Sequence, residues 1–129
     1  MSNSWYHAQS AARHWGGEPS DYLPIEEFID GSKQSFADVR HRALYHHTQG
    51  VWLCQQVFGT TITVTRQHSE IHVPVREIAE RHIVEDLGYI PSPGDWLKNM
   101  NIQGWMGGKR HRFIGREALL NTTLKEAMK

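Results

Sequence analysis

Residues 60–88, TTITVTRQHSEIHVPVREIAERHIVEDLG, carry the clearest structural pattern in the chain. Two runs rich in β-branched side chains, residues 60–65 and 71–76, flank the polar segment RQHSE, which predicts a β-hairpin. Pro74 limits the second run to a short strand or a sheet edge, because proline has no N–H to donate. Residues 75–87 then return to a helical period and end at a glycine. We therefore expect a hairpin that leads directly into a helix.

The segments on either side are predicted to be helical. Ser4 is expected to cap the first helix, and Pro24 suits the first position of a short second helix. Ser92 followed by Pro93 is typical of another helix start. Helices are expected over residues 4–15, 24–30, 33–58, 75–87, 93–100 and 115–128, with a loop at 16–23. The predicted fold class is mainly α, a compact helical domain of about five to six helices with one β-hairpin near residues 60–76.

Composition is typical of a globular protein. The chain has 129 residues, and its formal net charge is zero, so no overall field would recruit nucleic acid or an anionic membrane. Cys54 is the single cysteine, which excludes an internal disulfide. The N-terminal segment is too polar for a signal peptide, and the apolar runs are too short to span a membrane, so we expect a cytoplasmic protein. A helical core domain is expected over residues 1–100, followed by a basic C-terminal extension and helix over 101–129.

Polar side chains interrupt the apolar stripe of the helix predicted over residues 33–58. At about 100° per residue, Arg40 and His47 fall within the stripe, whereas His46 lies at its flank and His41 on the opposite side. Gly50 also falls on the stripe. Because glycine is costly inside a helix, it predicts close packing of another element at that point.

The helix predicted over residues 75–87 has the same feature. His82 and Asp86 fall within its apolar face, and their spacing of four residues makes them neighbours. If the two helices pack through these faces, Arg40 and His47 converge with them. Buried charges without partners are costly, so the four side chains must pair, bind an ion or line a wet cleft.

Two interpretations of this cluster need no metal. In the first, an internal hydrogen-bond network, Asp86 orients His82, and Arg40 pairs with Asp86 or Glu85. In the second, a catalytic pocket, His47 or His82 is the general acid or base and Arg40 holds an anion.

The third interpretation is a metal site. Imidazole and carboxylate groups suit zinc, manganese, iron or nickel, and an i,i+4 pair presents two ligands on one helix face. The predicted ligands are His47, His82 and Asp86, with His46, His7 or water completing the coordination shell. All three interpretations stay open on the sequence.

Other residues point to surfaces or to packing. Trp52 lies opposite the apolar stripe, and Trp105 stands beside a basic segment, so both are candidates for a partner surface. The basic segment, GGKRHR at residues 107–112, is the one place where phosphate contacts with a nucleic acid are expected. Cys54 is expected to be a buried small apolar residue rather than a nucleophile.

Two stretches, FADVRHRALYHHTQGVWL at residues 36–53 and VPVREIAERHIVEDLGYIPSPGDWL at residues 73–97, resemble a family of small uncharacterised proteins of bacteriophages and bacterial mobile elements. The resemblance extends over residues 5–98. It implies a protein that acts in the host bacterial cytoplasm, and it implies no catalytic role. A looser resemblance is to HD-type metal phosphohydrolases, but their adjacent His-Asp pair is absent, and the adjacent pair here is His46-His47.

The leading hypothesis is therefore a small cytoplasmic phage-type accessory protein with a buried His/Asp-centred polar site. It is expected to act by binding a host protein, for example in counter-defence or host takeover, and a homodimer is a further expected assembly. The alternative is a metal-dependent phosphohydrolase-like enzyme acting on a nucleotide or phosphate ester.

Overall fold

The structure, a computed structural model, describes residues 3–108. The chain divides into two units, Met1–Lys98 and Asn99–Lys129. The described part of the second unit holds one turn of 3-10 helix, Gly104–Gly107 (η3). The helix predicted at residues 115–128 and most of the basic segment 107–112 lie outside the described residues.

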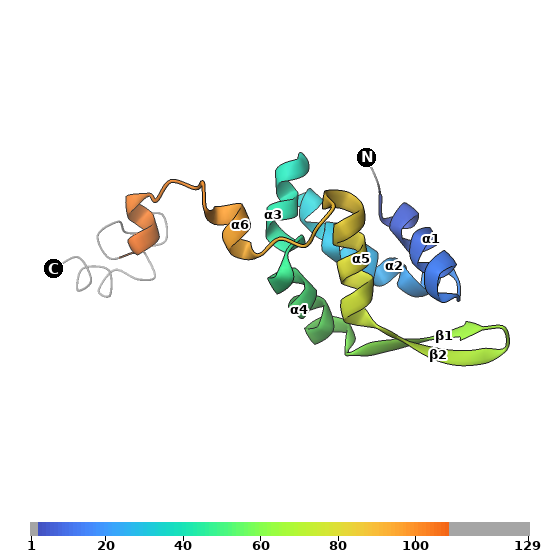
Figure 1. Ribbon diagram of the computed structural model, residues 1–129. Helices are drawn as coiled ribbons and strands as arrows, with labels where there is room; N and C mark the ends of the chain where they lie inside the picture. Colours follow the sequence, from blue (N-terminus) through green and yellow to red (C-terminus); the bar gives the residue numbers. More distant parts are fainter. Residues whose placement is uncertain (1–2, 109–129) are drawn as a thin grey trace, which may run out of the picture. The chain divides into compact units, whose positions relative to one another are not determined.

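The first unit consists of helices and one antiparallel hairpin (Figure 1), which confirms the predicted fold class. No helix among residues 3–108 is both long and apolar enough to cross a membrane. In chain order the elements are α1 (Ser4–Trp15), α2 (Pro19–Asp30), η1 (Gly31–Gln34), η2 (Val39–His41), α3 (Arg42–Tyr45), α4 (Thr48–Phe58), β1 (Thr61–Arg66), β2 (Ser69–Pro74), α5 (Val75–Leu87) and α6 (Pro93–Leu97).

The hairpin and α5 lie where the sequence predicts them. Strand β1 pairs with β2 through a two-residue turn at Gln67 and His68, both with positive φ, as hairpin turns of this length require. Pro74 ends β2, and Val75 opens α5 by donating its N–H to the Thr60 carbonyl. Figure 1 shows the hairpin extending from the ends of α4 and α5.

The starts of the first two helices differ from the prediction, α1 in its capping residue and α2 by five residues. Asn3, not Ser4, caps α1 by accepting the Tyr6 N–H. Helix α2 begins at Pro19 rather than Pro24, so the predicted loop at residues 16–23 is wrong. Pro24 lies inside α2, where its missing N–H costs one hydrogen bond that the buried face of the helix offsets.

The long helix predicted over residues 33–58 is wrong, because the chain breaks at two points. Residues 31–41 form only short 3-10 turns, and a second break falls between α3 and α4. There His47 is extended and caps α4, its Nδ1 accepting the Gly50 N–H at 3.1 Å.

Distant residues stabilise the second break. The indole N–H of Trp96 donates to the His46 carbonyl at 2.9 Å, and the Thr48 N–H donates to the Pro91 carbonyl at 2.9 Å. These bonds satisfy backbone groups that a continuous helix would have satisfied itself. Helical periodicity is a local signal and carries no information about such partners.

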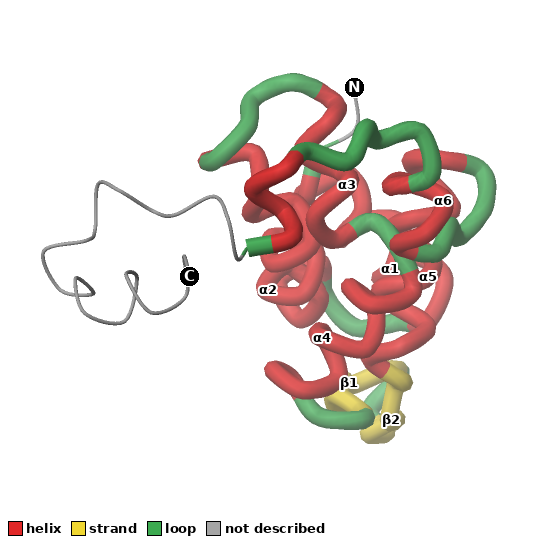
Figure 2. The backbone as a smooth tube through the Cα atoms, turned by 90° about the vertical axis from the view of Figure 1, so that its left-hand side faces the viewer, coloured by secondary structure: helices red, strands yellow, loops and turns green. Residues whose placement is uncertain are grey.

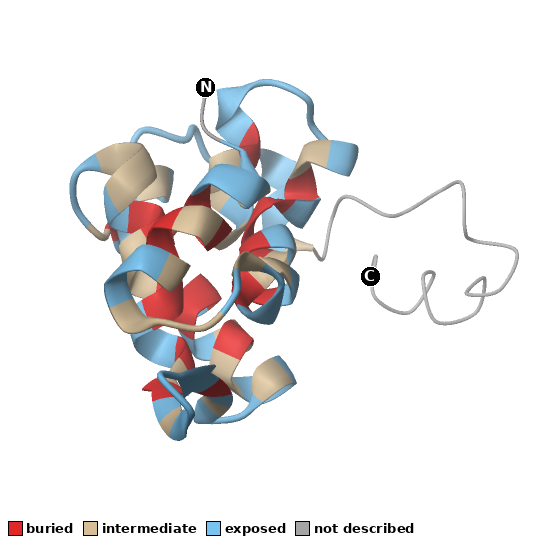
Figure 3. Ribbon diagram, turned by 90° about the vertical axis from the view of Figure 1, so that its right-hand side faces the viewer, coloured by how far each residue is buried: buried red, intermediate tan, exposed pale blue. Residues whose placement is uncertain are grey.

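The core lies where α1, α2, α4 and α5 meet one end of the hairpin (Figures 2 and 3), and the buried residues face inward from each element. Cys54 is fully buried among them, as predicted. The fully enclosed apolar side chains are Ala8, Ala11, Tyr22, Ile25, Ile29, Val51, Cys54, Val64, Val73, Val75, Ile78, Ala79 and Ile83.

Gly50 provides a test of the second break. A Cβ at this position would overlap the carbonyl of Tyr45, which ends α3, so Gly50 does pack closely against another element, as predicted. We expect Gly50→Ala to lower the free energy of unfolding by about 3 kcal/mol or more. Gly31→Ala is the matched control, because Gly31 has helical φ and ψ and open space around it. Equal stability of the two variants in urea denaturation would contradict the break.

Candidate metal centre

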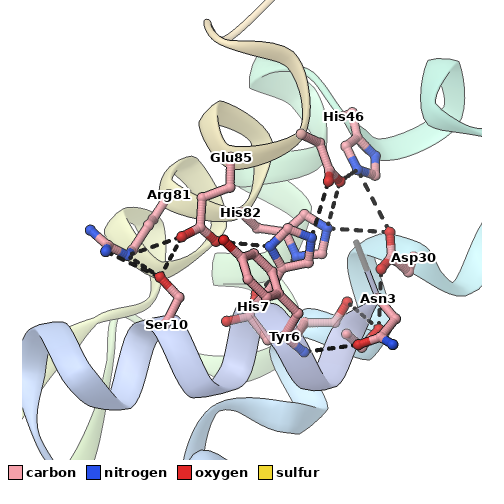
Figure 4. A network of polar contacts seen from close by, with 12 residues as sticks. Asn3, Tyr6, His7, Ser10, Asp30, His46, Arg81, His82 and Glu85 are labelled. Atoms are coloured by element: carbon pink, nitrogen blue, oxygen red, sulfur yellow. Dashed lines mark hydrogen bonds and ion pairs between the residues drawn. The ribbon is translucent and has the colours of Figure 1, made fainter. Parts of the chain in front are cut away.

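Four polar side chains from three segments converge inside the first unit. Asp30 ends α2, His46 lies in the break between α3 and α4, and His82 and Asp86 stand four residues apart on α5. One ligand atom from each lies within 4.8 Å of the other three. Figure 4 shows His46, His82 and Asp30 pointing toward one another.

The spacing of these atoms suits a single ion. Asp86 Oδ2 lies 2.9 Å from His46 Nε2 and 3.3 Å from His82 Nε2. Asp30 Oδ1 lies 3.2 Å from His82 Nε2 and 3.7 Å from His46 Nε2. Ligand atoms at 2.0–2.1 Å around a tetrahedral zinc ion would be separated by about 3.3 Å. These four separations are therefore close to the spacing that an ion would impose.

Two further carboxylates contact two imidazole rings at Nδ1, the nitrogen that does not face Asp86. Glu26 Oε1 lies 2.8 Å from His82 Nδ1, and Glu85 Oε1 lies 2.8 Å from His7 Nδ1. The rings of His7 and His82 are stacked, with centroids 3.7 Å apart and an interplanar angle of 29°. Metal-binding histidines commonly donate their second ring N–H to a carboxylate in this way.

Cationic and hydroxyl groups surround the cluster. Arg42 Nη2 lies 3.6 Å from Asp86 Oδ1, and Lys33 Nζ lies 3.9 Å from Asp30 Oδ2. Ser4 donates its hydroxyl to Asp30 Oδ2 at 3.1 Å. On the far side of Glu85, Ser10 donates to the carboxylate and accepts from the Arg81 guanidinium (Figure 4).

The surroundings shift the pKa values of these groups. Burial opposes the charged form of His82, but hydrogen bonds to Asp30, Asp86 and Glu26 outweigh it and raise its pKa to about 11. For Asp86, burial is outweighed by the three histidines, so the pKa of this carboxyl is lowered. Burial dominates for Glu26 and raises its pKa. Burial likewise lowers the pKa of His46.

The side chains of His82 and Asp86 are enclosed and adjacent, as the sequence predicts. His47 is also buried, but its place in the cluster was predicted wrongly. Its Nδ1 caps α4, and its Nε2 lies 3.0 Å from the Leu44 carbonyl, so both ring nitrogens serve the local backbone. The neighbouring residue, His46, occupies the position in the centre.

The predicted orientations of Arg40 and His41 are reversed. Arg40 is exposed, and its Nη2 lies 2.7 Å from Asp38 Oδ2. It therefore does not pair with Asp86 or Glu85 in the core, contrary to the prediction. His41 is fully buried, with its Nδ1 3.0 Å from the Ser32 hydroxyl. The cause is the interruption of the predicted helix, because residues 39–41 form a 3-10 turn whose rotation per residue differs from that of an α-helix.

Glu26 and Asp30 were missed by sequence reasoning. They stand four residues apart on α2, on the face that also buries Tyr22 and Ile29. Once a helix is started at Pro19, this i,i+4 carboxylate pair on an apolar face becomes a visible signal, equivalent to His82 and Asp86 on α5. His7, named above only as an additional ligand, does reach the cluster.

The two tryptophans named for a partner surface are both exposed, Trp52 on α4 and Trp105 in η3 of the second unit. Exposure alone identifies no partner, so a host-protein or homodimer surface stays a prediction.

Comparison with protein families identifies the family of this chain. Residues 2–106 match the family described as Domain of unknown function (DUF6915), and the chain belongs to that family. No curated protein and no solved structure matches the chain.

Arg40 and His41, whose orientations differ from the prediction, provide a test of the surroundings of the site. We expect His41→Ala to lower the free energy of unfolding by about 2 kcal/mol or more, because it removes a buried ring together with its contact to the Ser32 hydroxyl. Arg40→Ala should leave stability unchanged within error, because the Asp38 pair is solvent-exposed. Urea denaturation of both variants measures the difference, and a larger loss for Arg40→Ala would contradict the structure.

Proposed function

We propose that this protein binds one divalent transition metal ion through Asp30, His46, His82 and Asp86, and that the ion holds its helices together. The observation that carries the proposal is the surroundings of His82, whose two ring nitrogens both face carboxylates. The raised pKa of His82 describes one way to satisfy both sides, a proton on each ring nitrogen. A cation in place of the Nε2 proton is the other way, because a neutral imidazole has one N–H and can donate to only one side. With Nδ1–H donated to Glu26, the Nε2 lone pair faces the oxygens of Asp30 and Asp86, and a cation between them removes the repulsion.

The local charge balance supports the same conclusion. Four carboxylates surround the stacked rings, from Glu26, Asp30, Glu85 and Asp86. Within residues 3–108, three lysine or arginine side chains approach them, Lys33, Arg42 and Arg81. With neutral histidines the group carries one negative charge in excess, by four minus three. Buried charge of this kind requires a proton or a metal ion as compensation.

A structural role for the ion follows from its surroundings. A shell of four or more protein ligands holds no reactive water, which is typical of structural rather than catalytic sites. The ligands come from α2, from the break before α4 and from α5, so one ion would cross-link three segments. Nitrogen and oxygen ligands are compatible with zinc, manganese, iron or nickel.

A closed centre favours a protein that acts through its surface. We retain the proposal of a host-protein contact, which the resemblance to phage and mobile-element proteins supports. Trp52 is a candidate anchor because its side chain is half exposed on α4.

One observation favours the enzymatic alternative. Asp30, Ser4 and Lys33 line a surface hollow of about 630 Å³, so one side of the centre borders a space that could admit a small substrate. A phosphohydrolase would need the ion to exchange one ligand for water. Hydrolysis of a simple phosphodiester by the metal-loaded chain, abolished by Asp86→Asn, would support this alternative over the structural role.

Metal binding can be tested by thermal melts of the untagged chain after treatment with EDTA. We expect zinc, manganese or nickel to raise the melting temperature on the order of 10 °C, because an ion at about a hundredfold above its Kd stabilises the folded state by about 2.7 kcal/mol. Elemental analysis of protein purified without a His-tag should find one metal ion per chain.

Variants identify the site. Asp86→Asn and His82→Gln should abolish the metal response, whereas His14→Gln, an exposed histidine on α1, should leave it intact. A wild-type melt that is indifferent to both chelator and metal would refute the proposal in favour of a protonated hydrogen-bond network.

A further inference from the structure

A second pair of buried atoms lies beside the four-ligand centre. His7 Nε2 and Asp86 Oδ1 are 3.1 Å apart, within ion-pair distance, but their geometry makes no hydrogen bond, and neither atom has a hydrogen-bond partner elsewhere among the described residues. Both side chains are almost completely enclosed, His7 fully and Asp86 to 2% exposure. Buried polar atoms are rarely left unpaired, so this pair calls for a ligand.

The ring of His7 is oriented by a glutamate in the same way as the ring of His82. Each ring has its Nδ1 held at 2.8 Å by a glutamate, Glu85 in one case and Glu26 in the other. The two rings stack, and the Nε2 atom of each lies next to one oxygen of Asp86, at 3.1 Å for His7 and 3.3 Å for His82. The contact to Glu85 leaves the His7 Nε2 lone pair free for a cation.

We infer that His7 is a fifth protein ligand of the ion, with Asp86 binding through both of its oxygens. This inference rests on the proposed metal centre and specifies its coordination. His7 stands outside the group whose atoms all lie within 4.8 Å, so its ring moves toward the ion on binding. A shell of three imidazoles and two carboxylates selects an ion that accepts five or six ligands, such as manganese(II), iron(II) or nickel(II), over tetrahedral zinc.

The alternative occupant, a second ion bridged by Asp86, is less well supported. Among the described residues, His7 Nε2 and Asp86 Oδ1 are the two atoms available to it, since Glu85 is engaged with His7 Nδ1. The guanidinium of Arg42, 3.6 Å from Asp86 Oδ1, would repel a second cation at that place.

Cobalt(II) serves as the probe, because its visible absorption is strong in four-coordinate sites and weak in five- or six-coordinate ones. The metal-free full chain is titrated with cobalt(II) as wild type, His7→Gln and the matched control His14→Gln on the same helix. We expect weak absorption and one ion per wild-type chain. His7→Gln should increase the absorption and weaken binding by about ten- to a hundredfold, while His14→Gln should match the wild type.

The outcomes separate the two proposals. Strong absorption by the wild type, with the same absorption and the same cobalt(II) affinity in His7→Gln, would overturn the role of His7. The four-ligand centre would remain supported by that result. Two ions per wild-type chain, falling to one in His7→Gln, would overturn the single-ion shell in favour of a bridged pair. No cobalt binding by the wild type would refute the metal centre itself.

A measurement on the wild type guards against a variant that fails to fold. Cadmium(II), which accepts six ligands, is added to chain labelled in its histidine nitrogens, and scalar coupling between the ion and each ring nitrogen is recorded by NMR. Coupling to Nε2 of His7, His46 and His82 is expected. Coupling to His46 and His82 without His7 would overturn the inference.

Discussion

The imidazole of His82 contacts three carboxylates, those of Glu26, Asp30 and Asp86, in the interior of the first unit. Each of these carboxylates is almost completely enclosed, so none can rely on water for solvation. Removing the partner of a buried charge typically costs about 3–5 kcal/mol, a large part of the stability of a small domain. The helices that carry these groups, α2 and α5, are therefore held in one relative position.

The break between α3 and α4 follows from the same requirement. A continuous helix would leave His46 at the flank of the apolar stripe, whereas the break turns its Nε2 toward Asp86 at 2.9 Å. The interruption frees backbone groups, and Trp96 satisfies one of them at the His46 carbonyl. A locally unfavourable backbone is thus retained because it places one ligand, with tertiary hydrogen bonds offsetting the cost.

Sequence reasoning succeeded where local signals and tertiary structure agree. The hairpin, α5 and the buried pair of His82 and Asp86 follow from β-branched runs, a helical period and i,i+4 spacing. It failed where a distant contact overrides the local pattern. His47 was placed in the cluster instead of His46 because one helical period was applied across the break. A break changes the direction in which the following side chains point, so a single helical wheel assigns them to the wrong face.

The missed carboxylates, Glu26 and Asp30, show a different kind of failure. Pro24 was taken as a helix start because proline is frequent at that position, but Pro19 takes the role and Pro24 is tolerated inside the helix. Starting the helix five residues late concealed the face that carries both carboxylates. The candidate site therefore depended on an element boundary, which is the least reliable part of a sequence-based prediction.

A proton and a metal ion can both compensate the buried carboxylates, but they differ in what they demand of the stacked rings. His7 and His82 each have both nitrogens directed at carboxylates, so satisfying them with protons alone places two positive rings 3.7 Å apart. At an effective dielectric constant of about 20, two unit charges at that separation repel by about 4 kcal/mol. A divalent ion leaves both rings neutral, keeps each Nδ1–H donated to its glutamate and places the positive charge at the carboxylate oxygens. The stacking of two carboxylate-bound imidazoles thus favours a metal ion over two protons.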